Sequence, residues 1–72
     1  MTNIAQQIFT IFEKDENAII TIETLRGEIV TGKIVMLDYR SFGLEQENGE
    51  RELFVARQVK SVVEVKASNH DC

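Results

Sequence analysis

Three arginines at predicted turns are the side chains best suited to contact an anionic ligand. Arg26, Arg40 and Arg57 all lie outside the centres of the predicted strands. A guanidinium group pairs with phosphate and can lie flat on a base, and the rings of Tyr39 and Phe42 offer stacking platforms beside Arg40. Two interpretations stay open. The arginines are either solvated or bound to phosphates, and the rings are either buried or free to stack on bases.

The sequence offers little for catalysis or metal binding. A hydrolytic triad needs a histidine held against a nucleophile, and the only histidine, His70, lies two residues from the C-terminal end of the sequence. With one cysteine, Cys72, no zinc-ligand spacing exists. The glycines match neither a phosphate-binding loop nor a dinucleotide fingerprint, because no predicted helix follows any of them. We therefore predict that the protein is not an enzyme and needs no metal or cofactor.

The length of the chain points to one small domain that needs support from partner copies. A sequence of 72 residues supplies a single domain, predicted at 1–66, followed by a flexible polar tail at 67–72. Its single cysteine allows no intrachain disulfide, so self-association is the expected source of extra stability. No apolar run approaches the ~18 residues of a membrane span. A cytoplasmic location without membrane contact is expected.

The net charge is the main argument against a nucleic-acid partner. The chain carries 12 acidic and 8 basic residues, for a net charge of -4. Local potential can nevertheless oppose net charge where the acids are concentrated elsewhere. Seven of the acids fall in two groups, at the predicted helix exit and at a predicted hairpin: Glu13, Asp15, Glu16, Glu45, Glu47, Glu50 and Glu52.

Apolar spacing predicts an amphipathic helix at 3–14. Asn3 is the expected N-cap, accepting from amides of the first turn, and Gln6 is placed to reach back to it. A helix of about twelve residues is marginal alone in water, so its apolar face must lie on the rest of the fold. The apolar residues that recur at intervals of three and four are Ile4, Ile8, Ile11 and Phe12.

Five short strands are predicted after the helix. Gly32 lies within the second strand and marks a bulge, a sharp bend or a close backbone approach. Asn48-Gly49 predicts a hairpin with a type I′ turn. This order predicts a mostly β fold, in which a helix precedes a strongly bent five-stranded antiparallel sheet that forms a small open barrel. The strands are expected at 18–25, 29–37, 42–46, 53–56 and 59–65.

Four residues within 20–38 follow a spacing that is typical of a known family. Leu25 and Gly27 form a Leu-x-Gly unit, Gly32 follows five residues later, and Asp38 six residues after that. In this spacing the chain resembles the first motif of the Sm-like (LSm) family, which includes the bacterial Hfq proteins. The resemblance covers roughly residues 3–66. It implies an SH3-like barrel that assembles into rings, the fourth strand of one subunit pairing with the fifth strand of the next.

The residues of the predicted fourth strand favour such pairing independently of the resemblance. They are more apolar than a solvent-facing edge strand should be, and an unpaired apolar edge favours the addition of another strand. Ring closure would remove the edges and add buried surface. The residues expected at the interface between copies are Leu53, Phe54, Val55, Val62 and Val63.

The resemblance also implies that single-stranded RNA contacts the inner rim of the ring. By position, the stacking residue of the family corresponds to Arg40, and its base-bonding asparagine corresponds to Phe42. Asp38 either caps the following turn through backbone amides or orients the stacking residue. Arg57 is the basic group that stands near the pore. The expected nucleic-acid contacts are Arg26, Asp38, Tyr39, Arg40, Phe42 and Arg57.

These observations give one leading functional hypothesis and two competing ones. The leading hypothesis is a homo-oligomeric Sm-like ring that binds single-stranded nucleic acid, RNA before DNA, with a role in RNA processing or chaperoning. The first competitor is a protein-interaction or scaffold ring that kept the barrel without an RNA site. The second is an unrelated SH3-like barrel that acts as a monomer.

Overall fold

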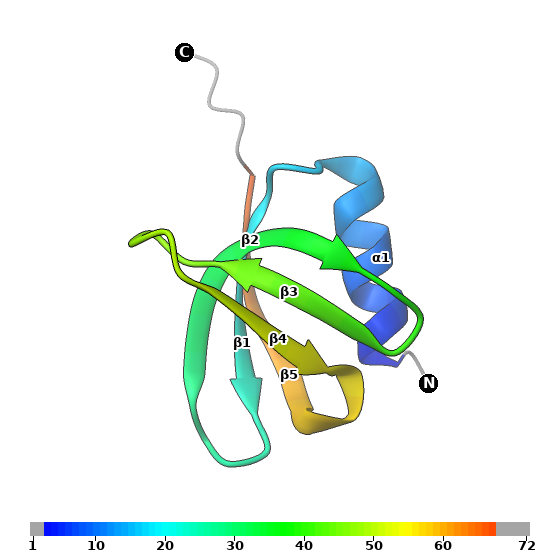
Figure 1. Cartoon of the computed structure of the whole chain (residues 1–72). Helices are drawn as coiled ribbons and strands as arrows, with labels where there is room; N and C mark the ends of the chain where they lie inside the picture. Colours follow the sequence, from blue (N-terminus) through cyan, green and yellow to red (C-terminus); the bar gives the residue numbers. More distant parts are fainter. Residues whose placement is uncertain (1–2, 68–72) are drawn as a thin grey trace.

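The computed structural model describes residues 3–67 as one helix and one five-stranded antiparallel sheet (Figure 1). The strand order is β4-β3-β2-β1-β5, so the sheet is not closed and β4 and β5 are its edges. The mostly β fold with an N-terminal helix is confirmed. The elements are α1 (Ile4–Lys14), β1 (Ile19–Thr24), β2 (Ile29–Leu37), β3 (Ser41–Glu45), β4 (Arg51–Val55), the 3-10 helix η1 (Ala56–Gln58) and β5 (Val59–Lys66).

The ends of the chain receive only a partial description. Of the predicted tail at 67–72, Ala67 follows β5 outside any strand, and residues 68–72 lie outside the described part of the chain. Over residues 3–67, no helix is both long enough and apolar enough to cross a membrane.

Helix α1 begins where the sequence predicts. The Asn3 side chain accepts a hydrogen bond from the Gln6 N–H at 2.8 Å, which confirms the N-cap. Ile8 is the one fully buried residue of the helix, and Ile4, Ile11 and Phe12 pack against the same core. The helix contacts β5 and η1, so it covers the β5 side of the sheet.

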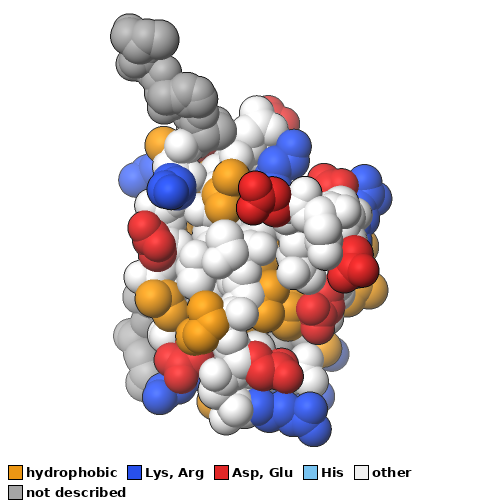
Figure 2. Space-filling view, turned by 90° about the vertical axis from the view of Figure 1, so that its left-hand side faces the viewer, with side chains coloured by type: hydrophobic (Ala, Val, Ile, Leu, Met, Phe, Trp, Pro, Cys, Tyr) orange, Lys and Arg blue, Asp and Glu red, His pale blue; other side chains and the backbone are white. Residues whose placement is uncertain are grey.

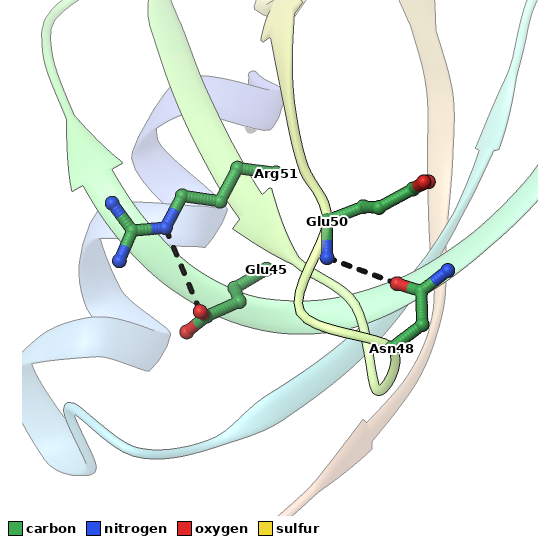
Figure 3. Close-up of polar contacts among 4 residues, drawn as sticks. All are labelled: Glu45, Asn48, Glu50 and Arg51. Atoms are coloured by element: carbon green, nitrogen blue, oxygen red, sulfur yellow. Dashed lines mark hydrogen bonds and ion pairs between the residues drawn. The ribbon is translucent and has the colours of Figure 1, made fainter.

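The hairpin between β3 and β4 exists, but its predicted type I′ turn is wrong. The Gly49 N–H donates to the Gln46 carbonyl at 2.8 Å, and the Gln46 N–H donates to the Glu50 carbonyl at 2.7 Å. This three-residue loop needs a positive φ at one position only, and Gly49 supplies it with φ of +89°. The Asn48 side chain instead accepts from the Glu50 N–H at 2.9 Å (Figure 3). The loop has one residue more than a type I′ turn, and it therefore needs one positive φ instead of two.

The hairpin between β1 and β2 is built in the same way. The Gly27 N–H donates to the Thr24 carbonyl, the Thr24 N–H donates to the Glu28 carbonyl, both at 2.9 Å, and Gly27 has φ of +89°. The buried Thr24 hydroxyl accepts from the N–H groups of Arg26 and Glu28, at 3.2 and 3.1 Å. Two similar loops therefore turn the chain at Gly27 and Gly49, the positions where a side chain would be strained.

Strand β2 bends so that its two halves pair with different neighbours (Figure 1). Residues 29–33 pair with β1, and residues 33–37 pair with β3. A Cβ at Gly32 would lie 2.8 Å from the Glu45 carbonyl oxygen, so Gly32 marks a close backbone approach. The bulge lies between Ile34 and Met36, at Val35. Of the three interpretations of Gly32, close approach is the one confirmed.

The hydrophobic core lies between the helix and the concave side of the sheet. Every element except η1 contributes to it, and the ring of Phe42 stacks on that of Phe54 with centroids 5.5 Å apart. Alternation along β1 buries Ile20, Ile22 and Thr24 and leaves the intervening residues less buried. The buried cluster consists of Ile8, Ile20, Ile22, Ile34, Phe42, Leu44, Phe54 and Val59.

A matched pair of glycine substitutions tests the close approach at residue 32. Gly32→Ala is expected to lower the free energy of unfolding by about 1–3 kcal/mol, because the new Cβ meets a backbone carbonyl that cannot move without shifting β3. Gly43→Ala is the control: its Cβ would meet the end of the exposed Leu53 side chain at 3.2 Å, which can rotate away. Urea unfolding of both variants measures the difference. Equal stability losses would contradict the role given to Gly32.

Candidate nucleic-acid interface

An open groove of about 870 Å³ runs between the start of α1, the turn after β2, η1 and the first half of β5. Two other hollows among the described residues are smaller, at about 390 Å³ each. The residues that line the groove include three cations, Arg40, Arg57 and Lys60, and the exposed Tyr39. Asn3 and Gln7 of the helix side add two amide groups, and Ile4, Val55, Val59 and Val62 add apolar surface.

Backbone hydrogen bonds bring the turn after β2 against η1. Ser41 pairs with Val55, and the Ala56 N–H donates to the Arg40 carbonyl at 2.7 Å, so the β3–β4 ladder extends by one more bond. Arg40 and Arg57 therefore belong to two segments joined by the backbone, although seventeen positions separate them in the sequence. The arrangement does not depend on the flexible arginine side chains.

The turn that carries Tyr39 and Arg40 is held by Asp38. The Asp38 N–H donates to the Ser41 carbonyl at 2.9 Å, and the Asp38 carboxylate accepts from the Tyr39 N–H at 2.7 Å. The capping interpretation of Asp38 is thus confirmed, and Asp38 is absent from the residues that line the groove. Tyr39 at the tip is 85% exposed, so its ring is free to accept a flat partner.

The charge of the groove differs from that of the whole chain. Three of its lining residues are cations and none is Asp or Glu, whereas the sequence has a net charge of -4. The predicted acidic hairpin lies at the opposite ends of β3 and β4, because β3 begins beside Arg40 and ends at Glu45. Topology therefore separates the two kinds of charge along the length of these strands.

Two predicted site residues lie in the core instead: Phe42, expected at the nucleic-acid site, and Phe54, expected at the interface between copies. Phe42 is 1% exposed and lies in the core, so its ring is no platform for a base. Phe54 is 4% exposed and stacks on Phe42, so its side chain supports the subunit's own core rather than an interface. Both residues occupy the inward side of β3 and β4 as a cross-strand pair. The burial alternative is the one that holds for Phe42.

The remaining predicted residues fall in several places. Arg26 lies in the β1–β2 loop and does not line the groove. Of the expected interface residues, Leu53, Val55 and Val63 are exposed on the edge strands, with Leu53 66% and Val63 56% exposed. Val62 is half-buried against the core and lines the groove.

Sequence reasoning missed Lys60 and the two helix amides. Lys60 lies at a bulge: Val59 and Ser61 pair with consecutive residues of β1, which leaves Lys60 as the extra residue of β5. No pattern in the sequence signals that bulge. Asn3 and Gln7 fall in the helix predicted at 3–14, and their place beside the groove depends on how α1 packs on β5 and η1.

The face shown in Figure 2 has a different character from the groove. Acidic and basic side chains are interspersed there with small apolar groups, without one continuous basic patch. Across residues 3–67, no group of three or more His, Cys, Asp or Glu side chains could hold a metal ion. The groove, by contrast, is lined by three cations and the exposed Tyr39 and by no acidic residue.

A pair of substitutions separates the core ring from the exposed ring. Phe42→Leu is expected to lower the free energy of unfolding by at least about 1 kcal/mol, because buried ring atoms are lost. Tyr39→Leu is expected to change it by no more than about 0.5 kcal/mol, because the ring is exposed. Thermal unfolding of the two variants checks the assignment. A Tyr39 variant less stable than the Phe42 variant would overturn it.

Comparisons of this chain with known protein families, with curated proteins and with solved structures found no match. The function of the groove must therefore be inferred from its own residues. Three cations, an exposed tyrosine and two amides line one open groove that holds no acid.

Proposed function

We propose that this protein is an Sm-like ring subunit that binds single-stranded RNA in the groove. The observation that carries the proposal is the gathering of Arg40, Arg57 and Lys60 around the exposed Tyr39 with no acidic lining residue. Cations neutralise phosphates, and an aromatic ring stacks on a base. A role in RNA processing or chaperoning follows from the family resemblance.

The exposed ring favours single strands over duplexes. A base inside a duplex is stacked on both faces, so a protein ring reaches it only after it has been displaced. Tyr39 stands at the tip of a turn capped by Asp38, which positions the ring without a contact from the core. Amide groups of Asn3 and Gln7 could then hydrogen-bond a base edge. These contacts suit RNA or DNA single strands, and RNA is preferred on the resemblance alone.

The negative net charge is compatible with this proposal. The acids at the β3–β4 hairpin lie at the far end of these strands from the groove, and one of them, Glu45, is paired with Arg51 at 3.6 Å (Figure 3). Charges separated by more than about 10 Å are largely screened at 0.1 M salt. The charged residues that line the groove itself are all cations, so their local potential supports binding of an anion there.

Ring assembly is proposed from the two free edges of the sheet. We infer that the bent sheet is the open barrel of an Sm-like subunit, in which β4 of one copy pairs with β5 of the next. Exposed apolar side chains lie on both edges: Leu53 and Val55 on β4, Val63 and Val65 on β5. Pairing would bury them and satisfy the edge backbone groups.

A scaffold ring without an RNA site remains the second candidate. It is favoured by Leu25 and Ile29, which are exposed at the β1–β2 hairpin and lie neither on an edge strand nor in the groove. Exposed apolar groups outside an assembly interface suit a protein partner. The absorbance ratio at 260 and 280 nm of purified protein, before and after nuclease, separates the candidates. Co-purifying RNA favours the first candidate, and its absence favours the second.

Fluorescence anisotropy with labelled oligo-U and oligo-A tests RNA binding. Three phosphate contacts predict that log K falls with log salt at a slope of about -2 between about 50 and 200 mM. Tyr39→Leu should weaken binding by about 1–3 kcal/mol for each stacked base. Arg57→Glu should weaken it further by reversing a charge in the groove.

Lys14→Glu is the control for the charge reversal. Lys14 lies in the last turn of α1 and does not line the groove. It changes the net charge as much as Arg57→Glu does, but it should leave RNA affinity nearly unchanged in the same titration. Loss of affinity that is equal in both variants, or no binding to either oligomer at low salt, would contradict the groove as an RNA site.

Charged substitutions on the edge strands test ring assembly. Leu53→Lys on β4 and Val63→Lys on β5 are each expected to reduce the oligomer to smaller species, because a charge would be buried between copies. Met36→Lys is the control, since Met36 is also exposed but lies on β2 in the interior of the sheet. Sedimentation velocity measures the mass. A wild-type protein that sediments as a monomer would overturn the ring.

A further inference from the structure

The tip of the β3–β4 hairpin brings together the atoms for a reaction of the chain with itself. Asn48 and Gly49 are exposed there, and the Asn48 side-chain oxygen accepts from the Glu50 N–H at 2.9 Å (Figure 3). The side-chain nitrogen of Asn48 points away from this hydrogen bond. Gly49 has no side chain, and nothing lies within 4 Å of the place where its Cβ would be. The side of Gly49 that a Cβ would shield is therefore open.

These atoms suit an attack of the Gly49 backbone nitrogen on the carboxamide carbon of Asn48. The reaction closes a succinimide ring within the chain, so the nucleophile and its target are already joined. Negative charge develops on the side-chain oxygen during the attack, and the Glu50 N–H that donates to this oxygen stabilises that charge. The loop thus supplies a nucleophile, an electrophile and a hydrogen-bond donor.

One hydrogen bond must break before the attack. The Gly49 N–H donates to the Gln46 carbonyl at 2.8 Å, and the nitrogen cannot attack while it is held in this way. The loop is exposed from Glu47 to Glu50 and contributes nothing to the buried core, so it opens at a lower cost than the strands do. Brief opening of the loop is therefore enough, without unfolding of the sheet.

Asn17 gives a comparison within the same chain. It is also exposed, and its side-chain oxygen accepts from the Lys33 Nζ at 3.4 Å. The N–H of the next residue, Ala18, donates to the Asp15 carbonyl at 3.0 Å, as that of Gly49 does to a carbonyl of its own loop. Ala18, however, carries a methyl group and is only 2% exposed. Attack by its nitrogen is therefore hindered, whereas Asn48 is the one asparagine of the sequence that a glycine follows.

We propose that Asn48 is a site of spontaneous deamidation in which Gly49 is the nucleophile. The Gly49 nitrogen bonds to the side-chain carbonyl carbon, the bond from that carbon to Nδ2 breaks, and ammonia leaves with the proton that Gly49 gave up. Water then opens the succinimide ring. Cleavage at the side-chain carbonyl leaves an aspartate at position 48, and cleavage at the main-chain carbonyl leaves an isoaspartate. Either product adds one negative charge to the net charge of -4.

The two products differ in what they do to the hairpin. An aspartate keeps an oxygen within reach of the Glu50 N–H, so the loop keeps its hydrogen bonds. An isoaspartate puts an extra carbon into the main chain of a loop that is closed by backbone hydrogen bonds of 2.7 and 2.8 Å at Gln46. Isoaspartate therefore loosens the start of β4, whereas aspartate changes only the charge.

Ageing of the purified protein at neutral and mildly alkaline pH tests the proposal. Peptide mapping by mass spectrometry measures loss of the amide at Asn48 and at Asn17 in the same sample. We expect loss at Asn48 to be at least about tenfold faster, a barrier difference of about 1.4 kcal/mol, and to yield isoaspartate as well as aspartate. Equal rates at the two positions overturn the proposal. So does aspartate without isoaspartate, because direct hydrolysis of the amide gives aspartate alone.

Gly49→Ala tests the nucleophile. The added methyl group hinders the attack, so this variant should lose the Asn48 amide at least about tenfold more slowly than the wild type. Gly49 has φ of +89°, so alanine strains the folded loop, and the two proteins are therefore also compared in urea, where that strain plays no part. Equal rates in urea overturn the role of Gly49.

Asn48→Asp separates the effect of charge from that of the main chain. This variant should unfold at the same temperature as the wild type, because the Glu50 N–H keeps an acceptor. The isoaspartate fraction of aged protein, purified by ion exchange, should unfold at a lower temperature. An isoaspartate fraction as stable as Asn48→Asp contradicts the loosening of the hairpin.

Discussion

The close approach of Gly32 to the Glu45 carbonyl is the contact on which the shape of the molecule depends. Gly32 has no Cβ, so β2 and β3 can come together at this point, where β2 leaves β1 and turns toward β3. The bulge at Val35 adds to the bend in the second half of β2. One strand thus serves two parts of the sheet, and the core lies between them and the helix. The same bend brings the end of β2 and its turn toward η1, so the groove is a consequence of the backbone geometry.

The bend also explains why the sheet ends in two free edges. A five-stranded sheet that curves but does not close leaves each outer strand, β4 and β5, with a neighbour on one side only. One backbone N–H at the end of β4, that of Val55, already has a hydrogen-bond partner within the subunit, because it donates to the Gln58 side chain at 3.2 Å. That contact limits the backbone groups that a partner strand can use at the end of β4. The rest of the edge carries the exposed Leu53, where an added strand would bury most surface.

Local patterns in the sequence predicted the elements well, because local chemistry determines them. The helix follows from its apolar period and its Asn3 cap, and β1, β2 and β5 follow from runs of β-branched residues. The hairpin type and η1 escaped prediction, since both depend on how the neighbouring strands are aligned. Register sets the side to which a strand residue points, and it turns Phe42 inward opposite Phe54, whereas Tyr39 is exposed because it lies in the turn between β2 and β3. Lys60 reaches the groove only because of a bulge in β5.

The net charge of the chain does not describe the charge of the groove. An acidic total of -4 sums over positions that the fold places at different ends of the same strands. Strand β3 connects these ends: at its start lies the turn with Arg40, and at its end lies Glu45 before the acidic hairpin. Reversing the order of charge along β3 and β4 would leave the composition unchanged but put acids beside η1. The quantity that matters for an anionic ligand is thus the charge at one end of the sheet, and register and topology determine it.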